Sequence, residues 1–251
     1  MAVTRAPEVY ADFLLPFLTP DSHLLDVGCG SGELSLGLAA YAGHVTGIDV
    51  DDAEIEAARR EGSRLGVANA EFRRGDAYAL DLPDGRVDAV LAHSVLEALD
   101  RPGDALTEMR RVLRPGGVAA VASVEYGGLI LAGPNPDLVR RFYRIRERLW
   151  QINGAEPYRG RELRGLCLGA GFVDVTATTT YISYGTAALV REFGLGRAQD
   201  CTDHWYVSGA RQHGLATPEQ VESMRRAWLE WSAAPTSYAA FAWCRALARK
   251  P

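Results

Sequence analysis

The chain has 251 residues, of which 47% are hydrophobic, enough for a full core and too many for a disordered protein. Its formal net charge of −5 argues against a nucleic-acid partner, because such partners usually require a basic face. No apolar run approaches the roughly 18 residues of a membrane span, so no membrane association is expected. The four cysteines are scattered without zinc-ligand or disulfide spacing, which predicts no metal site and a cytoplasmic location.

The first predicted elements lead into a glycine-rich turn. Residues 8–18 have a helical pattern up to Pro16, and a strand is expected over 23–28. The strand runs into the sequence Asp26-Val27-Gly28-Cys29-Gly30-Ser31-Gly32, and a helical pattern follows. Glycines allow positive φ angles and close approach of a ligand, and the first turn of the helix offers N–H groups to an anion. A dinucleotide fingerprint would place its third glycine at Glu33, so the pattern here is a different one, D-x-G-x-G-x-G.

A second predicted strand, over 44–49, ends in an acidic residue. Asp49 lies 21 positions after Gly28, and a carboxylate there can accept two hydrogen bonds from a ribose diol. Asp51 and Asp52 follow at the start of the next predicted helix. We expect them to be capping charges rather than ligands.

Three more strands are predicted, and they alternate with helices as the first two do. They cover 70–73, 87–92 and 118–124, and the first is followed by Gly75-Asp76-Ala77. Strands that alternate with helices over short connections predict a parallel sheet with helices on both faces. Ligands of such sheets bind at the carboxyl ends of the strands. The glycine turn, Asp49, Asp76 and the Ala92-His93 pair are therefore expected on one edge.

The remainder of the chain reads as helices between two more strands. The predicted elements are a helix over 136–152, a helix near 160–170, a strand from 171 that extends to 184, two or three helices over 185–235, and a strand over 239–248.

All five tryptophans lie after residue 149. We expect Trp150, Trp228 and Trp231 to pack the added helices. Trp205, with Tyr206 and His204 beside it, is instead expected to line an aromatic lid over an apolar substrate.

These motifs resemble those of the class I S-adenosylmethionine-dependent methyltransferases. The pattern D-x-G-x-G-x-G resembles their motif I. Val95-Leu96-Glu97-Ala98-Leu99 and the later Arg114-Pro115-Gly116-Gly117 resemble their V-L-E-H-L and L-R-P-G-G stretches, with Ala98 in place of a frequent histidine. The resemblance covers roughly residues 20–125. It is greatest to the ubiquinone/menaquinone-methyltransferase-like branch, which includes natural-product enzymes.

The resemblance implies an α/β fold: a Rossmann-like, seven-stranded, mostly parallel sheet with an antiparallel last strand and a helical lid insertion. We expect residues 1–251 to form a single domain. Its core would comprise about 20–125 and 160–184 plus 237–249, and its lid elements about 1–19, 126–158 and 185–235.

The resemblance further implies S-adenosyl-L-methionine as cofactor, S-adenosyl-L-homocysteine as product, and a small-molecule acceptor, with secondary metabolites as the candidate class. Asp49 would bind the ribose, and Asp76 would bind the adenine amino group, unless it is only a turn residue beside Gly75. The oligomeric state is expected to be monomer or homodimer. The expected cofactor-binding residues are Asp26, Gly28, Cys29, Gly30, Gly32, Asp49, Val50, Asp76, Ala77, Ala92 and His93.

Methyl transfer from a sulfonium is an in-line displacement that requires no metal, and a nearby base can take the proton of the acceptor. His93 follows the fourth strand, and only its backbone is needed if it is not the base. Glu125 and Tyr126 are expected at the end of the fifth strand, facing the methyl pocket. His204 in the predicted lid is the fourth catalytic candidate, with a surface role as its alternative.

Two other functions are also compatible with the sequence. The chain could bind S-adenosylmethionine without transferring its methyl group, and the sequence barely distinguishes this function from methyl transfer. It could also be an NAD-dependent oxidoreductase on a related fold, although Glu33 at the third glycine position speaks against this.

Overall fold

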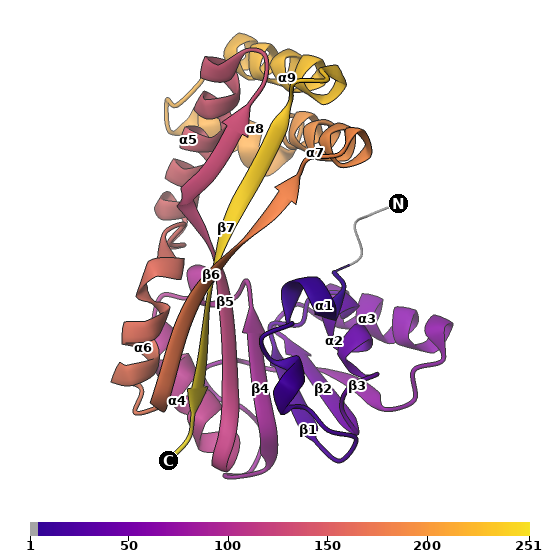
Figure 1. Cartoon of the computed structure of the whole chain (residues 1–251). Helices are drawn as coiled ribbons and strands as arrows, with labels where there is room; N and C mark the ends of the chain where they lie inside the picture. Colours follow the sequence, from indigo (N-terminus) through magenta and orange to yellow (C-terminus); the bar gives the residue numbers. More distant parts are fainter. Residues whose placement is uncertain (1–4) are drawn as a thin grey trace. The chain divides into compact units, whose positions relative to one another are not determined.

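The computed structural model describes residues 5–251. Within these residues, seven strands form one sheet in the order β3-β2-β1-β4-β5-β7-β6 (Figure 1). The strands are β1 (His23–Val27), β2 (His44–Asp49), β3 (Ala70–Arg74), β4 (Val87–His93), β5 (Leu113–Ala132), β6 (Val173–Tyr184) and β7 (Tyr238–Arg249). The α-helices are α1 (Pro7–Tyr10), α2 (Glu33–Leu38), α3 (Asp52–Leu65), α4 (Pro102–Val112), α5 (Pro136–Ile152), α6 (Leu163–Gly169), α7 (Ala187–Asp200), α8 (His204–Gln212) and α9 (Pro218–Ala233). The described part of the chain also contains three 3-10 turns: η1 (Leu15–Phe17), η2 (Leu96–Ala98) and η3 (Arg159–Glu162).

The sheet is mostly parallel, and its last strand runs the other way. β1 pairs in parallel with β2 and β4, β2 pairs with β3, and β4 pairs with β5. The residue after the end of β7 pairs with the start of β5. The Gly116 N–H donates to the Lys250 carbonyl at 2.9 Å, and the Lys250 N–H donates to the Gly117 carbonyl at 3.0 Å. The predicted antiparallel last strand is thereby confirmed.

The chain divides into two compact units. The first contains the described residues through Ser123 together with Arg159–Thr178 and Cys244–Pro251, and the second contains Val124–Tyr158 and Thr179–Trp243. The predicted lid ranges 126–158 and 185–235 fall entirely in the second unit, whereas the described part of 1–19 falls in the first. The organisation of the whole chain as a single domain stays a prediction.

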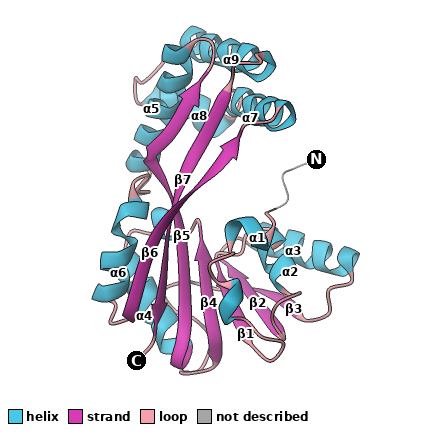
Figure 2. Ribbon diagram, in the orientation of Figure 1, coloured by secondary structure: helices cyan, strands magenta, loops and turns pink. Residues whose placement is uncertain are grey.

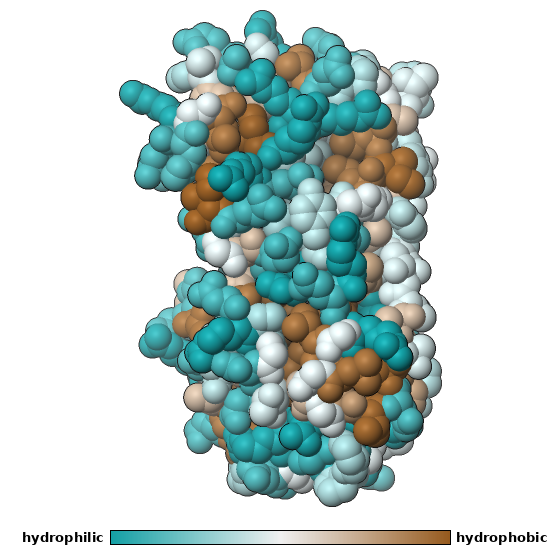
Figure 3. Space-filling model, turned by 90° about the vertical axis from the view of Figure 1, so that its left-hand side faces the viewer, coloured by the Kyte–Doolittle hydropathy of each residue, from teal (hydrophilic) through white to brown (hydrophobic). Residues whose placement is uncertain are grey.

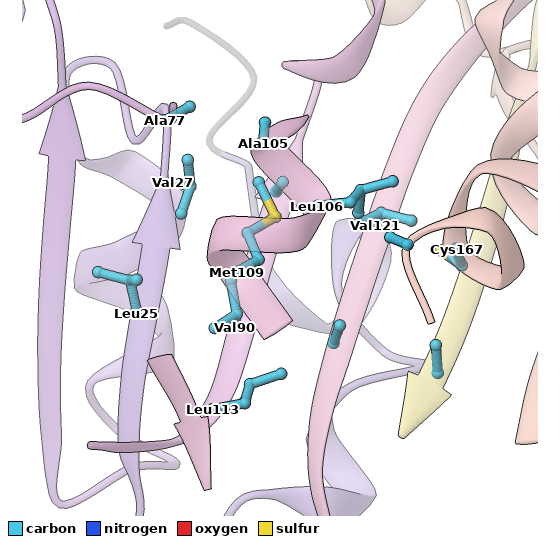
Figure 4. Packing of buried hydrophobic residues seen from close by; sticks show 14 of the residues in the cluster. Leu25, Val27, Ala77, Val90, Ala105, Leu106, Met109, Leu113, Val121 and Cys167 are labelled. Carbon is cyan, nitrogen blue, oxygen red and sulfur yellow. The ribbon is translucent and has the colours of Figure 1, made fainter. Parts of the chain in front are cut away.

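In the first unit, strand β1 is buried on both faces. Leu25 and Val27 belong to one apolar cluster, together with Met109 of α4 (Figure 4). Leu24, whose side chain points the other way, belongs to a second cluster with Leu38 of α2. A strand buried on both faces reads as a continuous apolar run, which is why β1 was recognisable in the sequence. Its carboxyl end delivers the glycine turn to the edge of the sheet.

The second unit contains helices α5, α7, α8 and α9 together with parts of strands β5, β6 and β7 (Figure 2). Its core is rich in aromatic side chains. Trp228 and Trp231 are fully buried, with ring centroids 5.4 Å apart, and Trp150 packs against the same cluster. The predicted packing role of these three tryptophans is confirmed, whereas Trp205 is 41% exposed.

The helix predicted over residues 8–18 is wrong. Helix α1 ends at Tyr10, and Ala11 leaves helical geometry with φ −134°. The carboxylate of Asp12 instead accepts a hydrogen bond from Arg245 at 2.6 Å, and the Leu14 side chain is fully buried. These tertiary contacts override the local helical pattern.

The predicted end of the fifth strand is also wrong. β5 begins at Leu113 and continues to Ala132, so Glu125 and Tyr126 lie within the strand rather than at its end. Two glycines follow Tyr126, yet the strand continues through them, and Gly128 lies close to β7. A Cβ atom there would come within 2.4 Å of the Ala242 Cβ. This glycine therefore permits close approach of two backbones.

Among residues 5–251, no helix has the length and apolar character needed to cross a membrane. On the face drawn in Figure 3, apolar residues form separate patches between hydrophilic side chains. The apolar surface of this face is therefore divided rather than continuous.

Candidate functional site

The glycine turn joins β1 to α2 and is fastened to the end of β2. The N–H groups of Gly28 and Cys29 donate to the carbonyl of Ile48 at 2.8 and 2.9 Å. Gly28 has φ +72° and Gly30 has φ +52°, a region that L side chains rarely adopt. The turn conformation therefore depends on glycine, and the hydrogen bonds fix where the turn lies.

The glycines of the turn meet different surroundings. A Cβ on Gly28 would come 2.4 Å from the Val95 Cγ2 atom, and one on Gly32 would come 2.8 Å from the Ala58 Cβ. A Cβ on Gly30 would find only the Glu54 Oε2 atom, at 3.8 Å. Gly28 and Gly32 therefore permit close packing, whereas Gly30 faces open space.

Asp49, the last residue of β2, holds the turn from the other side. Its Oδ2 atom accepts the Gly30 N–H at 2.9 Å, and its Oδ1 atom accepts the Asp51 N–H at 3.0 Å. Each carboxylate oxygen has two lone-pair sites, so each can accept one more hydrogen bond. Asp51 in turn caps α3, as predicted, because its side chain accepts the Ala53 N–H at 2.8 Å.

Two pockets of the first unit meet at this carboxylate, and both are lined by Gly28, Asp49 and Ser94. The first, which we name the polar pocket, has a volume of about 440 Å³. Its further lining includes Arg5, Cys29, Gly30, Glu33, Glu54 and His93. The second, the apolar pocket, has a volume of about 280 Å³. Its further lining includes Ile48, Val50, Gly75, Ala77, Val95 and Leu99.

His93 ends β4 and is 6% exposed on the wall of the polar pocket. Burial lowers its pKa to about 3, and the charges of Arg5 and Arg245 act in the same direction. The Tyr10 ring packs edge-on against the imidazole, with centroids 5.5 Å apart. The imidazole is therefore neutral at neutral pH and is a weak proton acceptor.

Asp26 is buried next to the turn, and its Oδ2 atom accepts a hydrogen bond from the Ser35 hydroxyl. Burial raises the pKa of Asp26 to about 7. Asp76 is exposed, and its Oδ1 atom accepts the Tyr78 N–H at 2.9 Å, as in a turn. Asp26 and Asp76 are absent from the linings of the polar and apolar pockets, although Gly75 and Ala77 on both sides of Asp76 line the apolar one.

The structure thus brings together most of the predicted cofactor-binding residues. Those that line one or both pockets are Gly28, Cys29, Gly30, Asp49, Val50, Ala77 and His93. Those that do not are Asp26, Gly32, Asp76 and Ala92.

The other predicted catalytic residues belong to the second unit. Glu125 is 7% exposed, and its Oε1 atom accepts the Gly127 N–H at 3.0 Å. The Tyr126 hydroxyl accepts a hydrogen bond from Arg146 at 3.3 Å, and burial raises its pKa, so this hydroxyl stays protonated at neutral pH. His204 is exposed at the start of α8, with its Nδ1 atom 3.2 Å from the Ser208 hydroxyl.

Several pocket residues were not anticipated from the sequence. Ser94 and Val95 lie just after the predicted strand over 87–92 and His93, so that position was the available signal. Glu33 was identified only as the residue at the third glycine position of the dinucleotide fingerprint, and no motif singled out Glu54. Arg5 lies before the first predicted element, and no pattern in the sequence marked it.

The sequence of this chain is similar to a known protein family and to several known proteins. Residues 25–121 match the family described as methyltransferase domain. An uncharacterized methyltransferase of Schizosaccharomyces pombe is 32% identical over 179 residues, which are 67% of this chain and 63% of that protein. An O-methyltransferase of Aspergillus nomiae is 37% identical over 173 residues, 66% of this chain and 71% of that one.

A third relative is described as an S-adenosyl-L-methionine-dependent Diels-Alderase of Talaromyces variabilis. It is 30% identical over 189 residues, 70% of this chain and 61% of that protein. The chain thus spans about three fifths of the length of several curated relatives that it matches.

Among solved structures, the YcgJ protein of Bacillus subtilis has a similar fold. The TM-score is 0.63 at 16% identity, with 97% of this chain and 99% of that chain covered. At this identity the likeness concerns the fold alone, and it agrees with the predicted Rossmann-like architecture.

Proposed function

The chain belongs to the class I S-adenosylmethionine-dependent methyltransferases, and from this premise we propose that it transfers a methyl group from S-adenosyl-L-methionine to a small-molecule acceptor. One observation carries the proposal: the polar and apolar pockets meet at Asp49, whose carboxylate oxygens keep free acceptor sites. A ribose diol at this point would place a base in one pocket and an amino-acid tail in the other.

The lining of each pocket fits one end of such a cofactor. In the apolar pocket, Ile48, Val95 and Leu99 offer apolar surface to an adenine ring. In the polar pocket, the Arg5 guanidinium and the Glu33 and Glu54 carboxylates offer both charge signs to a zwitterionic methionine group. A nicotinamide dinucleotide is disfavoured, because Glu33 occupies the third position of its glycine fingerprint.

When bound, the cofactor supplies a methyl group on a positively charged sulfur, which is already activated for displacement. The chain's own residues then have to orient the acceptor, exclude water and accept a proton. His93 is a weak candidate for the proton because its pKa is about 3. The Tyr126 hydroxyl is protonated at neutral pH. We propose that Glu125 accepts the acceptor's proton and that His93 acts by position.

The acceptor is proposed to be a small secondary metabolite. The O-methyltransferase of Aspergillus nomiae supports this class, and its name supports an oxygen atom as the methylated position. Membership of the ubiquinone/menaquinone-like branch, a cytoplasmic location and a monomeric or homodimeric state stay predictions.

The test is incubation of the protein with methyl-labelled S-adenosylmethionine and a panel of hydroxylated metabolites. Transfer of label to a panel member is expected, and S-adenosylhomocysteine should form in equal amount. In the Glu125→Gln variant, turnover should fall about 10²–10⁴-fold at saturating cofactor if Glu125 is the base. Full turnover in this variant would remove Glu125 from that role.

A second candidate function is use of the bound cofactor without methyl transfer. The similarity to the Diels-Alderase of Talaromyces variabilis, 30% identical over 189 residues, supports this second candidate. Tight binding of S-adenosylmethionine without any label transfer, together with consumption of a polyene substrate in the same mixture, would support this candidate over the first.

A further inference from the structure

A buried carboxylate beside both pockets joins the residue that follows the end of β4 to a residue within β5. Glu97, in η2, is 1% exposed. Its Oε1 atom accepts the Ser94 hydroxyl at 2.9 Å, and its Oε2 atom accepts the Ser123 hydroxyl at 2.7 Å. In the pairing of β4 with β5, His93 stands opposite Ala122. Ser94 and Ser123 are therefore the next residues along each strand, and one carboxylate holds both.

Ser94 has an unusual backbone. Its φ of +63° lies in the left-handed region, which glycine adopts freely and asparagine and aspartate adopt occasionally, but which costs energy for other residues. Such a conformation persists only where the surroundings enforce it. Two hydrogen bonds enforce it here: the Ser94 N–H donates to the Ala122 carbonyl at 2.8 Å, and the Ser94 hydroxyl donates to Glu97.

The position of Ser94 makes this strain relevant to binding. Ser94 lines the polar pocket and the apolar pocket, as only Gly28 and Asp49 also do among the described lining residues. Val95, the next residue, packs where a Gly28 side chain would stand and lines the apolar pocket. A change in the backbone at Ser94 would therefore move the shared wall of both pockets.

We propose that Glu97 is a positioning residue for cofactor binding. By holding Ser94 in its left-handed conformation, it fixes the wall where the two pockets meet, and it does so without lining either pocket itself. The inference rests on the proposed function, because the property it governs is the affinity for S-adenosylmethionine or S-adenosylhomocysteine.

The first test compares two substitutions that remove the same hydroxyl. Ser94→Ala leaves a Cβ atom at φ +63°, whereas Ser94→Gly accepts that angle without strain. Calorimetric titration with S-adenosylhomocysteine should give a dissociation constant about tenfold weaker for Ser94→Ala, and within about threefold of wild type for Ser94→Gly. Equal losses in the two variants would overturn the proposal.

The second test asks whether Glu97 acts through Ser94. Glu97→Met keeps much of the side-chain volume but accepts no hydroxyl hydrogen bond. It should weaken S-adenosylhomocysteine binding about tenfold in the wild-type background, and less than about threefold when combined with Ser94→Gly. The melting temperature of each ligand-free variant checks folding. A purely structural role would give the same change in dissociation constant in both backgrounds, and that result would contradict the proposal.

Asp174 supplies the matched control, since it also has a positive φ, of +51°, and lines neither pocket. Asp174→Ala should lower the melting temperature without changing the dissociation constant. A wild-type protein that fails to bind S-adenosylhomocysteine would overturn the proposed function and this inference together. Wild-type binding with equal losses at Ser94 would overturn the inference alone.

Discussion

The glycine turn of the first unit and the aromatic core of the second unit involve different kinds of polar contact. At the turn, the backbone N–H groups of Gly28 and Gly30 donate to the Ile48 carbonyl and the Asp49 carboxylate. In the second unit, long side chains meet beside the aromatic core. Arg146 and Arg197 both contact the Asp200 carboxylate, at 3.2 and 3.1 Å, and Arg146 also reaches Tyr126.

The difference has a physical consequence. Backbone hydrogen bonds fix the candidate cofactor site through a few positions where only glycine fits. The side-chain contacts of the second unit depend on the packing of many aromatic rings. Changes in the aromatic core should therefore affect stability more than cofactor affinity, and changes in the turn should affect both.

The largest expected effect is on the core of the second unit. Trp228 is fully buried, with Trp231 and Phe142 ring centroids at 5.4 and 5.7 Å. Trp228→Ala should lower the free energy of unfolding by roughly 3–5 kcal/mol in urea titrations, because it leaves a large cavity. The affinity of the folded protein for S-adenosylhomocysteine should stay within about threefold of wild type.

Trp205→Ala is the control, because Trp205 is 41% exposed and should lose far less stability. A tenfold loss of affinity in folded Trp228→Ala protein would show that the two units are not independent.

The next effect concerns the turn itself. In Gly28→Ala, the new Cβ would overlap Val95, and the alanine would have to adopt the backbone φ of +72°. We therefore expect a loss of roughly 2–5 kcal/mol in unfolding free energy. Cofactor affinity should fall more than tenfold. Gly66→Ala has a similar φ of +69° but no atom within 4 Å, so only the conformational strain of about 1–2 kcal/mol should remain. Equal losses in the two variants would argue against the overlap with Val95.

A smaller effect is expected from the carboxylate at the end of β2. Asp49→Ala should weaken S-adenosylhomocysteine binding by about 1–3 kcal/mol in calorimetry, through loss of the ribose hydrogen bonds. Asp51→Ala removes the cap of α3 and should lower stability by about 1 kcal/mol without changing affinity. Unchanged affinity in Asp49→Ala would remove Asp49 from the proposed ribose site.

A further effect is a pH dependence of stability. Burial raises the pKa of Asp26 from 3.8 to about 7, so folding favours its protonated form. Its stabilising contribution is complete below about pH 4 and is lost as the pH rises through 7. Melting temperatures of wild type and Asp26→Asn, measured from pH 5 to 8, should therefore diverge, with the variant showing the flatter profile. Parallel profiles would contradict the raised pKa.

Much of the fold was predictable because its signals are local. The strand over 44–49 and the helix over 136–152 have the predicted bounds, since an acidic strand end marks the first and Pro136 starts the second. The glycine turn needed no knowledge of distant residues. Its place beside Asp49 followed from the rule that parallel strands end on one edge.

What escaped prediction depends on contacts between distant residues. The helical pattern over 8–18 does not form a continuous helix, because Asp12 pairs with Arg245. The strand β5 continues through Gly127 and Gly128 because β7 lies beside it. The left-handed backbone of Ser94 requires Glu97 and a carbonyl of β5, which no window of sequence around it reveals.

A crystal structure of the protein with S-adenosylhomocysteine would test the proposed cofactor site most directly. We expect the ribose hydroxyls on Asp49, the adenine against Ile48, Val95 and Leu99, and the amino-acid group in the polar pocket. The ligand bound away from Asp49 in well-ordered density would contradict it.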